Sequence, residues 1–379
     1  MSHPPNGRRM LALRELLGLT QNEVARTLRI SQSALSKIEK AERPITPDLI
    51  DRASTSYGLP RRFFHIPPNA TEAGIPTFRK ASTAKVSDER RIVRHCREAA
   101  RIYSTAADQA GYHTSQIPHD LASREVEEAA SRLRAITGLS PEAPVPNMTR
   151  FLEKLGVGVI AHLDDGPEAV AQHMGVSIPE SIPSRPLVAL PHPLPGAVAR
   201  FTLAHELAHH IWDQNTTQSW TGRRAPQEQR AHAFANALLL PTSVLRRRVT
   251  ERLTLAAYLA IKADYGISVS AIITAAKRAG VISSERARSL RIQHSARGWR
   301  NNEPVHVASE RPLLLKQCLH RITVWDSASI ADTTAMPAAT IARWIDEAIP
   351  SAAPIISLQQ WRNRSDRIRR GARSEMTSL

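Results

Sequence analysis

Two histidines, His205 and His209, stand four residues apart inside an apolar stretch with helical periodicity from Val198 to Trp212. Residues four apart on a helix lie on one face, one turn above the other, so both imidazoles project to the same side. Glu206 follows the first histidine. Two such imidazoles can share a metal ion, and a neighbouring carboxylate can accept a proton from a water molecule that attacks a carbonyl. The stretch therefore predicts a helix that carries part of a metal site with hydrolytic chemistry.

The spacing leaves the third metal ligand open. The helical segment from Gln227 to Leu240 offers both Glu228 and His232, again four residues apart and on one face. Glu228 would give two histidines and a carboxylate, whereas His232 would give three histidines, and both sets occur in catalytic zinc sites. Zinc is the expected ion, although manganese and iron also bind oxygen and nitrogen ligands of this kind.

The first 66 residues carry two closely spaced helix starts. Thr20 and Ser31 are both good N-cap residues, and one short turn separates the helices that they begin. Two helices joined in this way are typical of a helix-turn-helix, whose second helix enters the major groove of DNA. The alternative is a helical hairpin whose polar face only meets water. The side chains expected to contact base edges or phosphates are Gln21, Gln32, Ser33, Ser36 and Lys37.

The chain of 379 residues has a formal net charge of +16. This excess attracts polyanions, of which nucleic acid is the first candidate, although an arginine-rich composition without a binding role would give the same total. Cys96 and Cys318 lie far apart, which predicts neither a disulfide framework nor a cysteine metal site. The N-terminus has no apolar core typical of a signal peptide or membrane span. We therefore expect a cytoplasmic protein with no membrane partner.

The pattern along the chain predicts a mainly α-helical protein with a small β-sheet, that is, an α+β fold. Short apolar runs at 157–160 and 187–190 predict strands among longer helical segments. The helices are expected at 84–113, 124–136, 151–156, 198–212, 227–240, 253–265 and 269–279, with two short ones within 327–349. We expect four parts: an all-α helix-turn-helix domain at 1–66, a Pro- and Gly-containing linker at 67–83, a metal-binding domain at 84–310, and a helical C-terminal region with a basic tail at 311–379.

Two stretches of the chain resemble known families. The sequence LTQNEVARTLRISQSALSKIE at 19–39 is similar to that of the Xre/Cro-type repressor domains. The resemblance covers about the first 65 residues. That resemblance implies a regulator that binds palindromic operator DNA as a homodimer. The stretch 200–241, which contains RFTLAHELAHH and EQRAHAFANALLLP, resembles the ImmA/IrrE family of zincin-like metallopeptidases.

The second resemblance assigns roles to residues of the motif. It implies that His205, His209 and Glu228 bind the metal and that Glu206 is the general base. His232 stands where the family usually has asparagine, and three roles are open to it: binding the metal, orienting Glu228, or packing.

The two resemblances together imply a function. Members of the ImmA/IrrE family typically cleave or inactivate Xre-type repressors, either as separate proteins or with such a domain fused at the N-terminus. We therefore expect a DNA-binding transcription regulator with a zinc-dependent endopeptidase domain that cleaves a repressor-type protein, or the chain's own linker near 67–80. The alternative is a regulator whose metal-binding domain is a ligand sensor or a dimerisation scaffold and cleaves nothing.

Overall fold

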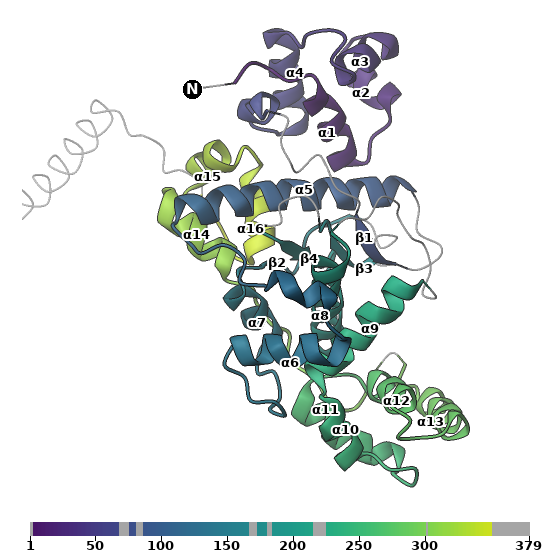
Figure 1. The fold of residues 1–379 in the computed structure, drawn as a ribbon. Coiled ribbons are helices and arrows are strands. Elements are labelled where there is room, and N and C mark those ends of the chain that lie inside the picture. The colour runs from purple at the N-terminus through teal and green to yellow at the C-terminus, as the bar shows by residue number, and fades with distance from the viewer. Residues whose placement is uncertain are drawn as a thin grey trace, which may run out of the picture.

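The structure is a computed structural model that describes residues 3–67, 76–80, 86–166, 173–179, 184–214, 225–300 and 302–350. These residues form a mainly helical protein with one four-stranded sheet, which confirms the predicted α+β class. Figure 1 shows the N-terminal helices at one end, a long helix across the molecule beneath them, and the sheet with the other helices beyond. Among the described residues no single helix has both the length and the apolar character to cross a membrane. Two consecutive helical segments, Leu255–Tyr265 and Val269–Arg278, meet both criteria only when taken together, and they are bent by 101° relative to each other.

The N-terminal helices form the predicted helix-turn-helix unit. Thr20 caps the second helix in a capping box with Glu23, and the Ser31 hydroxyl accepts a hydrogen bond from the Ala34 backbone N–H at the start of the third. Both predicted helix starts are therefore confirmed. The unit comprises α1 (Arg8–Leu17), α2 (Gln21–Thr27), α3 (Gln32–Glu39), α4 (Pro47–Tyr57) and the short 3-10 helix η1 (Arg61–His65).

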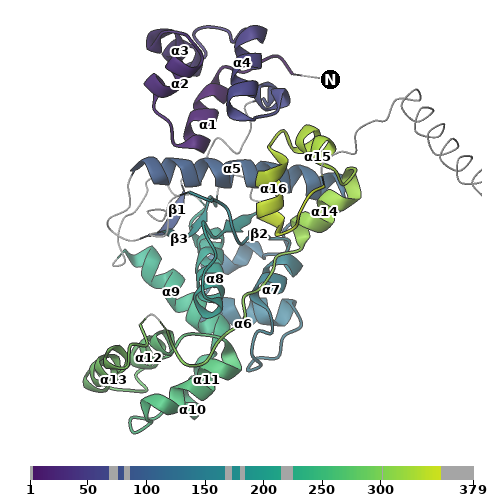
Figure 2. The ribbon, with the colours of Figure 1, turned by 180° about the vertical axis from the view of Figure 1, so that it is seen from behind.

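The long helix α5 (Val86–Gln109) carries the helix-turn-helix unit on one of its faces, as Figures 1 and 2 show from opposite sides. Apolar residues of both form one continuous core. Two ion pairs cross the contact: Arg9 Nη1 lies 2.7 Å from Glu98 Oε1, and Arg94 Nη2 lies 2.8 Å from Glu15 Oε2. Arg9 and Glu98 are only 3% and 2% exposed, so their charges depend on buried partners, and Arg101 Nε also lies 3.0 Å from Glu98 Oε2.

The sheet has the strand order β1-β3-β4-β2. Strand β3 runs antiparallel to both β1 and β4, whereas β2 and β4 are parallel. The strands predicted at 157–160 and 187–190 are confirmed as β2 and β4. The four strands are β1 (Thr77–Lys80), β2 (Gly158–Ile160), β3 (His173–Ser177) and β4 (Leu187–Ala189).

The sheet separates two hydrophobic cores. Side chains alternate between the faces of a strand, and along β4 Leu187 and Ala189 belong to the core shared with α5, whereas Val188 belongs to the other. The first core is completed by three C-terminal helices: α14 (Leu314–Ile322), α15 (Ser327–Thr334) and α16 (Ala338–Ile345). The second face of the sheet is covered by α8 (Gly196–Trp212), the helix of the two histidines.

The remaining helices surround α8 and extend the second core. They are α6 (Val126–Ile136), α7 (Met148–Lys154), α9 (Pro226–Leu239), α10 (Thr242–Arg248), α11 (Tyr258–Tyr265), α12 (Val269–Arg278) and α13 (Ser284–Ala296), with the 3-10 helices η3 (His119–Ser123) and η5 (Leu255–Ala257). The helices predicted from periodicity are confirmed, whereas α10, α13 and α14 were not predicted.

The predicted domain limits can be compared with these elements. Strand β1 lies within 67–83, the stretch predicted as a linker, and the flanking residues 68–75 and 81–85 lie outside the described residues. The basic tail predicted at 361–379 also lies outside them. Because the helix-turn-helix, α5 and the C-terminal helices share one core, the limits at 66, 83 and 310 stay predictions of sequence units.

Candidate metal centre

Helix α8 is buried along almost its whole length, between the sheet and α9. Its sequence is apolar on nearly every face, as expected for a helix inside a core. His205, Glu206 and His209 are 0% exposed. Three ionisable side chains are therefore held away from water, which is costly unless each is paired or binds an ion.

Helix α9 places Glu228 against both histidines. Nε2 of His205 lies 3.3 Å from Glu228 Oε2, Nε2 of His209 lies 3.5 Å from Glu228 Oε1, and the two Nε2 atoms are 3.3 Å apart. Ligands at about 2.0–2.1 Å from a tetrahedral zinc ion lie about 3.3–3.4 Å from one another. The three side chains therefore fit a zinc ion in both the type and the spacing of their donor atoms.

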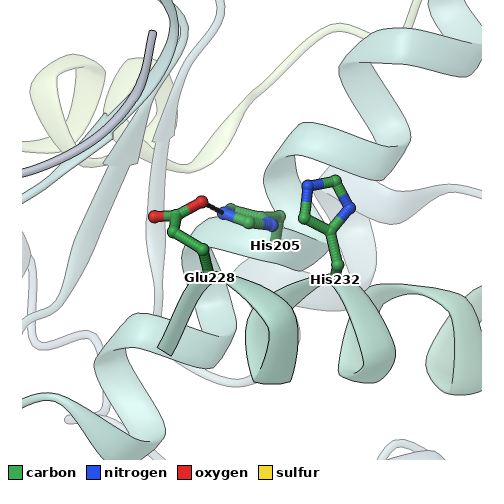
Figure 3. A group of neighbouring side chains, drawn as sticks. All are labelled: His205, Glu228 and His232. Carbon is green, nitrogen blue, oxygen red and sulfur yellow. Dashed lines mark ion pairs between the residues drawn. The ribbon is translucent and has the colours of Figure 1, made fainter. Parts of the chain in front are cut away.

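His232 lies on the other side of the His205 ring from Glu228, as Figure 3 shows. The ring centroids of His205 and His232 are 4.8 Å apart, and the His232 ring also lies 5.5 Å from that of Phe201. His205, Glu228 and His232 can form a second ligand set, with donor atoms within 4.8 Å of one another. The set with His209 has the shorter separations, and these match a tetrahedral ion more closely.

Asp213 orients His209. His209 Nδ1 donates a hydrogen bond to Asp213 Oδ2 at 2.7 Å, and Arg230 Nη2 lies 2.5 Å from Asp213 Oδ1. Burial alone would lower the pKa of His209, but Asp213 and Glu228 raise it to about 9. The Nδ1–H bond leaves Nε2 directed toward Glu228, the arrangement by which carboxylates position metal-binding histidines. Sequence reasoning missed Asp213, although it follows His209 at the four-residue spacing that had identified the histidines.

Strands β3 and β1 hold the Glu206 carboxylate. Ser177 Oγ donates to Glu206 Oε2 at 2.8 Å, and Thr77 Oγ1 lies 2.7 Å from Ser177 Oγ and 3.3 Å from Glu206 Oε2. Gly175 permits the close approach of β3 to α8, because a Cβ there would lie 2.5 Å from Thr202 Cγ2. Neither Ser177 nor Thr77 was predicted, since both come from strands that the sequence pattern did not reveal.

His210 fastens α8 to the sheet. It is 2% exposed, and its Nε2 donates to the backbone carbonyl of Leu187 in β4 at 3.1 Å. Burial lowers its pKa to about 4, so the ring is neutral at pH 7. This bond fixes the rotation of α8 and so helps to direct its neighbour His209 away from the sheet.

The predicted DNA contacts lie at the surface of the helix-turn-helix unit. Gln32, Ser33 and Lys37 are exposed on α3, and Ser36 is partly buried. Gln21 at the start of α2 lies beside these residues, because its Oε1 accepts a hydrogen bond from Gln32 Nε2 at 2.5 Å.

Gln21 is itself held in place by Glu39 and, through it, by Arg14. Its Nε2 donates to Glu39 Oε2 at 2.7 Å, and Arg14 Nε holds the other oxygen of Glu39 at 2.8 Å. The polar face is therefore pre-ordered from α1 through to the start of α3.

Two family models match parts of the chain. A family model described as helix-turn-helix matches residues 10–64, and one described as IrrE N-terminal-like domain matches residues 153–277. The chain joins an Xre-type helix-turn-helix domain to an IrrE-like domain. The second model is that of a metallopeptidase family, and the residues it matches include His205, Glu206, His209 and Glu228. The comparison with curated proteins gives no match.

Proposed function

We propose that this protein is a DNA-binding transcription regulator whose IrrE-like domain is a zinc-dependent endopeptidase. The observation that carries the proposal is the mutual spacing of 3.3 to 3.5 Å among His205 Nε2, His209 Nε2 and the Glu228 carboxylate, with Glu206 beside them. The substrate is a repressor-type protein or the chain's own linker. The protein acts in the cytoplasm, as a homodimer on a double-stranded operator.

In this proposal His205, His209 and Glu228 hold the metal, and Asp213 keeps His209 in the binding orientation. A bound zinc ion supplies a Lewis acid that polarises a peptide carbonyl and acidifies water. Glu206 accepts a proton from the attacking water and passes it to the nitrogen of the breaking C–N bond, so that an acid and an amine are released. Ser177 holds one Glu206 oxygen in place for both proton transfers.

On the DNA side, α3 enters the major groove. Its exposed Gln32, Ser33 and Lys37 and the partly buried Ser36 face base edges or phosphates. Gln21, anchored to Glu39, contacts a phosphate. Cleavage of a repressor bound nearby then changes transcription.

One observation favours a second function, in which the metal is structural and the domain is a sensor or dimerisation scaffold. Structural zinc sites are closed, whereas catalytic sites keep one position open. His205, Glu206 and His209 are all 0% exposed, so their side chains are shielded from a substrate in solution.

The test compares the wild-type protein with Glu206→Gln, both loaded with zinc and incubated with operator-bound Xre-type repressors from the same genome. Glu285→Gln on the exposed surface of α13 is the matched control. We expect mass spectrometry to find cleavage by wild type and by Glu285→Gln, and none by Glu206→Gln. If all three proteins bind zinc and DNA equally and cut nothing, including themselves, the peptidase proposal is wrong and the scaffold function replaces it.

A further inference from the structure

Strand β1 belongs to the sheet but comes from outside the part of the chain that matches the IrrE-like family. Strands β2, β3 and β4 all lie within the matched residues 153–277, whereas β1 precedes α5 in the chain. It pairs antiparallel with β3, with Thr77 opposite Ser177 and Phe78 opposite Val176. Without β1, the outer edge of β3 would be the open edge of the sheet.

That edge of β3 runs beside the proposed general base. Ser177 Oγ donates to Glu206 Oε2, and Gly175 lies so close to α8 that an added Cβ would meet Glu206 Oε1 at 2.8 Å. A segment that pairs with β3 must therefore pass next to Glu206. Thr77 does so: it is 4% exposed, and its hydroxyl lies 3.3 Å from Glu206 Oε2.

An open sheet edge is a template for an added strand, because its unpaired N–H and C=O groups bind the backbone of an extended peptide. A peptide bond must also lie in an extended, accessible segment to be cut. We propose that the outer edge of β3 is the docking edge for an extended protein substrate, and that the chain's own Thr77–Lys80 occupies it and closes the site until displaced. This inference rests on the proposed peptidase function.

Strand β1 is suited to displacement. Its four residues are fewer than the five or six of a common strand, and its register with β3 is irregular between Arg79 and Lys80. It is also tethered at both ends to the DNA-binding half: the helix-turn-helix unit precedes it, and α5, which carries that unit, follows. A substrate strand therefore competes with a short segment whose position depends on the helix-turn-helix unit.

The experiment measures the docking edge without hydrolysis. The full-length Glu206→Gln protein, loaded with zinc, is titrated into a fluorescent peptide with the sequence of residues 75–82, and binding is followed by anisotropy. Phe78→Pro and Arg79→Pro are each added to this background. Neighbouring strand residues direct their N–H groups to opposite sides, so one of the two prolines must remove an N–H that faces β3. Ala70→Pro, ahead of β1, is the control.

We expect at least one of the two strand prolines to raise peptide affinity tenfold or more over the Glu206→Gln background, and Ala70→Pro to leave it unchanged. Equal affinities in all four proteins would overturn the proposal. If a proline variant does not fold, hydrogen exchange on the Glu206→Gln protein replaces it. Excess peptide should then speed exchange of the β1 amides while those of β3 stay protected, and unchanged β1 exchange would equally overturn the proposal.

A second arm separates this inference from the peptidase proposal. The proline substitution that improves peptide binding is then made in a protein with Glu206 intact. This variant should cleave the repressor several-fold faster than wild type does. Peptide binding without any cleavage would leave the docking edge standing and refute the peptidase function. Cleavage at the same rate with and without the proline would support the peptidase and refute the occupied edge.

Discussion

In the candidate metal centre, Asp213 supports the proposed ligand His209 through a hydrogen bond. Replacing Asp213 by asparagine removes the negative charge that orients and polarises the imidazole, and such changes typically lower metal affinity 10- to 100-fold. We expect a loss of this size for Asp213→Asn, measured by competition with a chromophoric zinc chelator. Arg230→Gln is the control, because it leaves the 2.7 Å bond between His209 and Asp213 in place. Equal zinc affinity of wild type and Asp213→Asn would contradict the role given to Asp213.

His232 can be tested as a ligand in the same way. Because the Nε2 atoms of His205 and His209 and the Glu228 carboxylate already have tetrahedral spacing, we expect His232→Asn to keep its zinc, with affinity within about twofold of wild type. His205→Ala should lose the metal. Zinc content after gel filtration decides between these outcomes, and loss of zinc by His232→Asn as complete as that by His205→Ala would make His232 a ligand.

At the scale of elements, the contact between α1 and α5 depends on a buried charge. Burial alone would raise the pKa of Glu98, but Arg9, Arg101 and Arg94 hold it at about 2. Since this folded-state pKa lies below the unfolded value of about 4.3, the carboxylate stabilises the fold above that pH, and the contribution is lost as the pH falls toward 2.

Glu98→Gln should therefore lower the free energy of unfolding by about 3 kcal/mol at pH 7, because it leaves buried arginines without their partner. The variant should also lose less stability than wild type between pH 4 and pH 2. Urea unfolding at several pH values measures both effects. Glu128→Gln on α6, which breaks an exposed pair with Arg124, should change little at either pH. An equal loss of unfolding free energy in Glu98→Gln and Glu128→Gln would show that the buried charges stabilise the fold no more than an exposed ion pair does.

The elements also show what the sequence can and cannot predict. His205 and His209 were predictable as a pair on one face of α8, because a four-residue spacing within one helix is local. The same spacing on α9 left Glu228 and His232 as alternatives. The capped helices α2 and α3 were predictable because an N-cap is likewise local. Strand β3 was missed because the close approach to α8 requires Gly175, a poor strand former, in the middle of five residues. Thr77 and Ser177 meet Glu206 only through pairing between distant segments, which no local pattern records.

At the scale of the whole molecule, the net charge of +16 predicts DNA binding that weakens steeply with salt, because each phosphate contact releases a counterion. Lys37→Ala should weaken binding to all sequences and reduce the slope of log K against log salt by about 1. Fluorescence anisotropy with operator and random duplexes over a salt series measures this slope. Lys154→Ala, exposed on α7, is the charge-matched control. An unchanged slope for Lys37→Ala would remove Lys37 from the DNA contacts.

The helices α14 to α16 lie in the same hydrophobic core as α5 and the helix-turn-helix unit, although the whole IrrE-like match at 153–277 lies between α5 and α14 in sequence. Trp344 closes this core, and its indole N–H donates to the Leu163 carbonyl at 2.7 Å. During synthesis on the ribosome, α5 therefore emerges early but keeps an uncovered apolar face until α14 to α16 have been translated. The helix-turn-helix end of the molecule is therefore begun first and completed late. A nascent chain cannot present its helix-turn-helix on a finished support before the IrrE-like domain has been made.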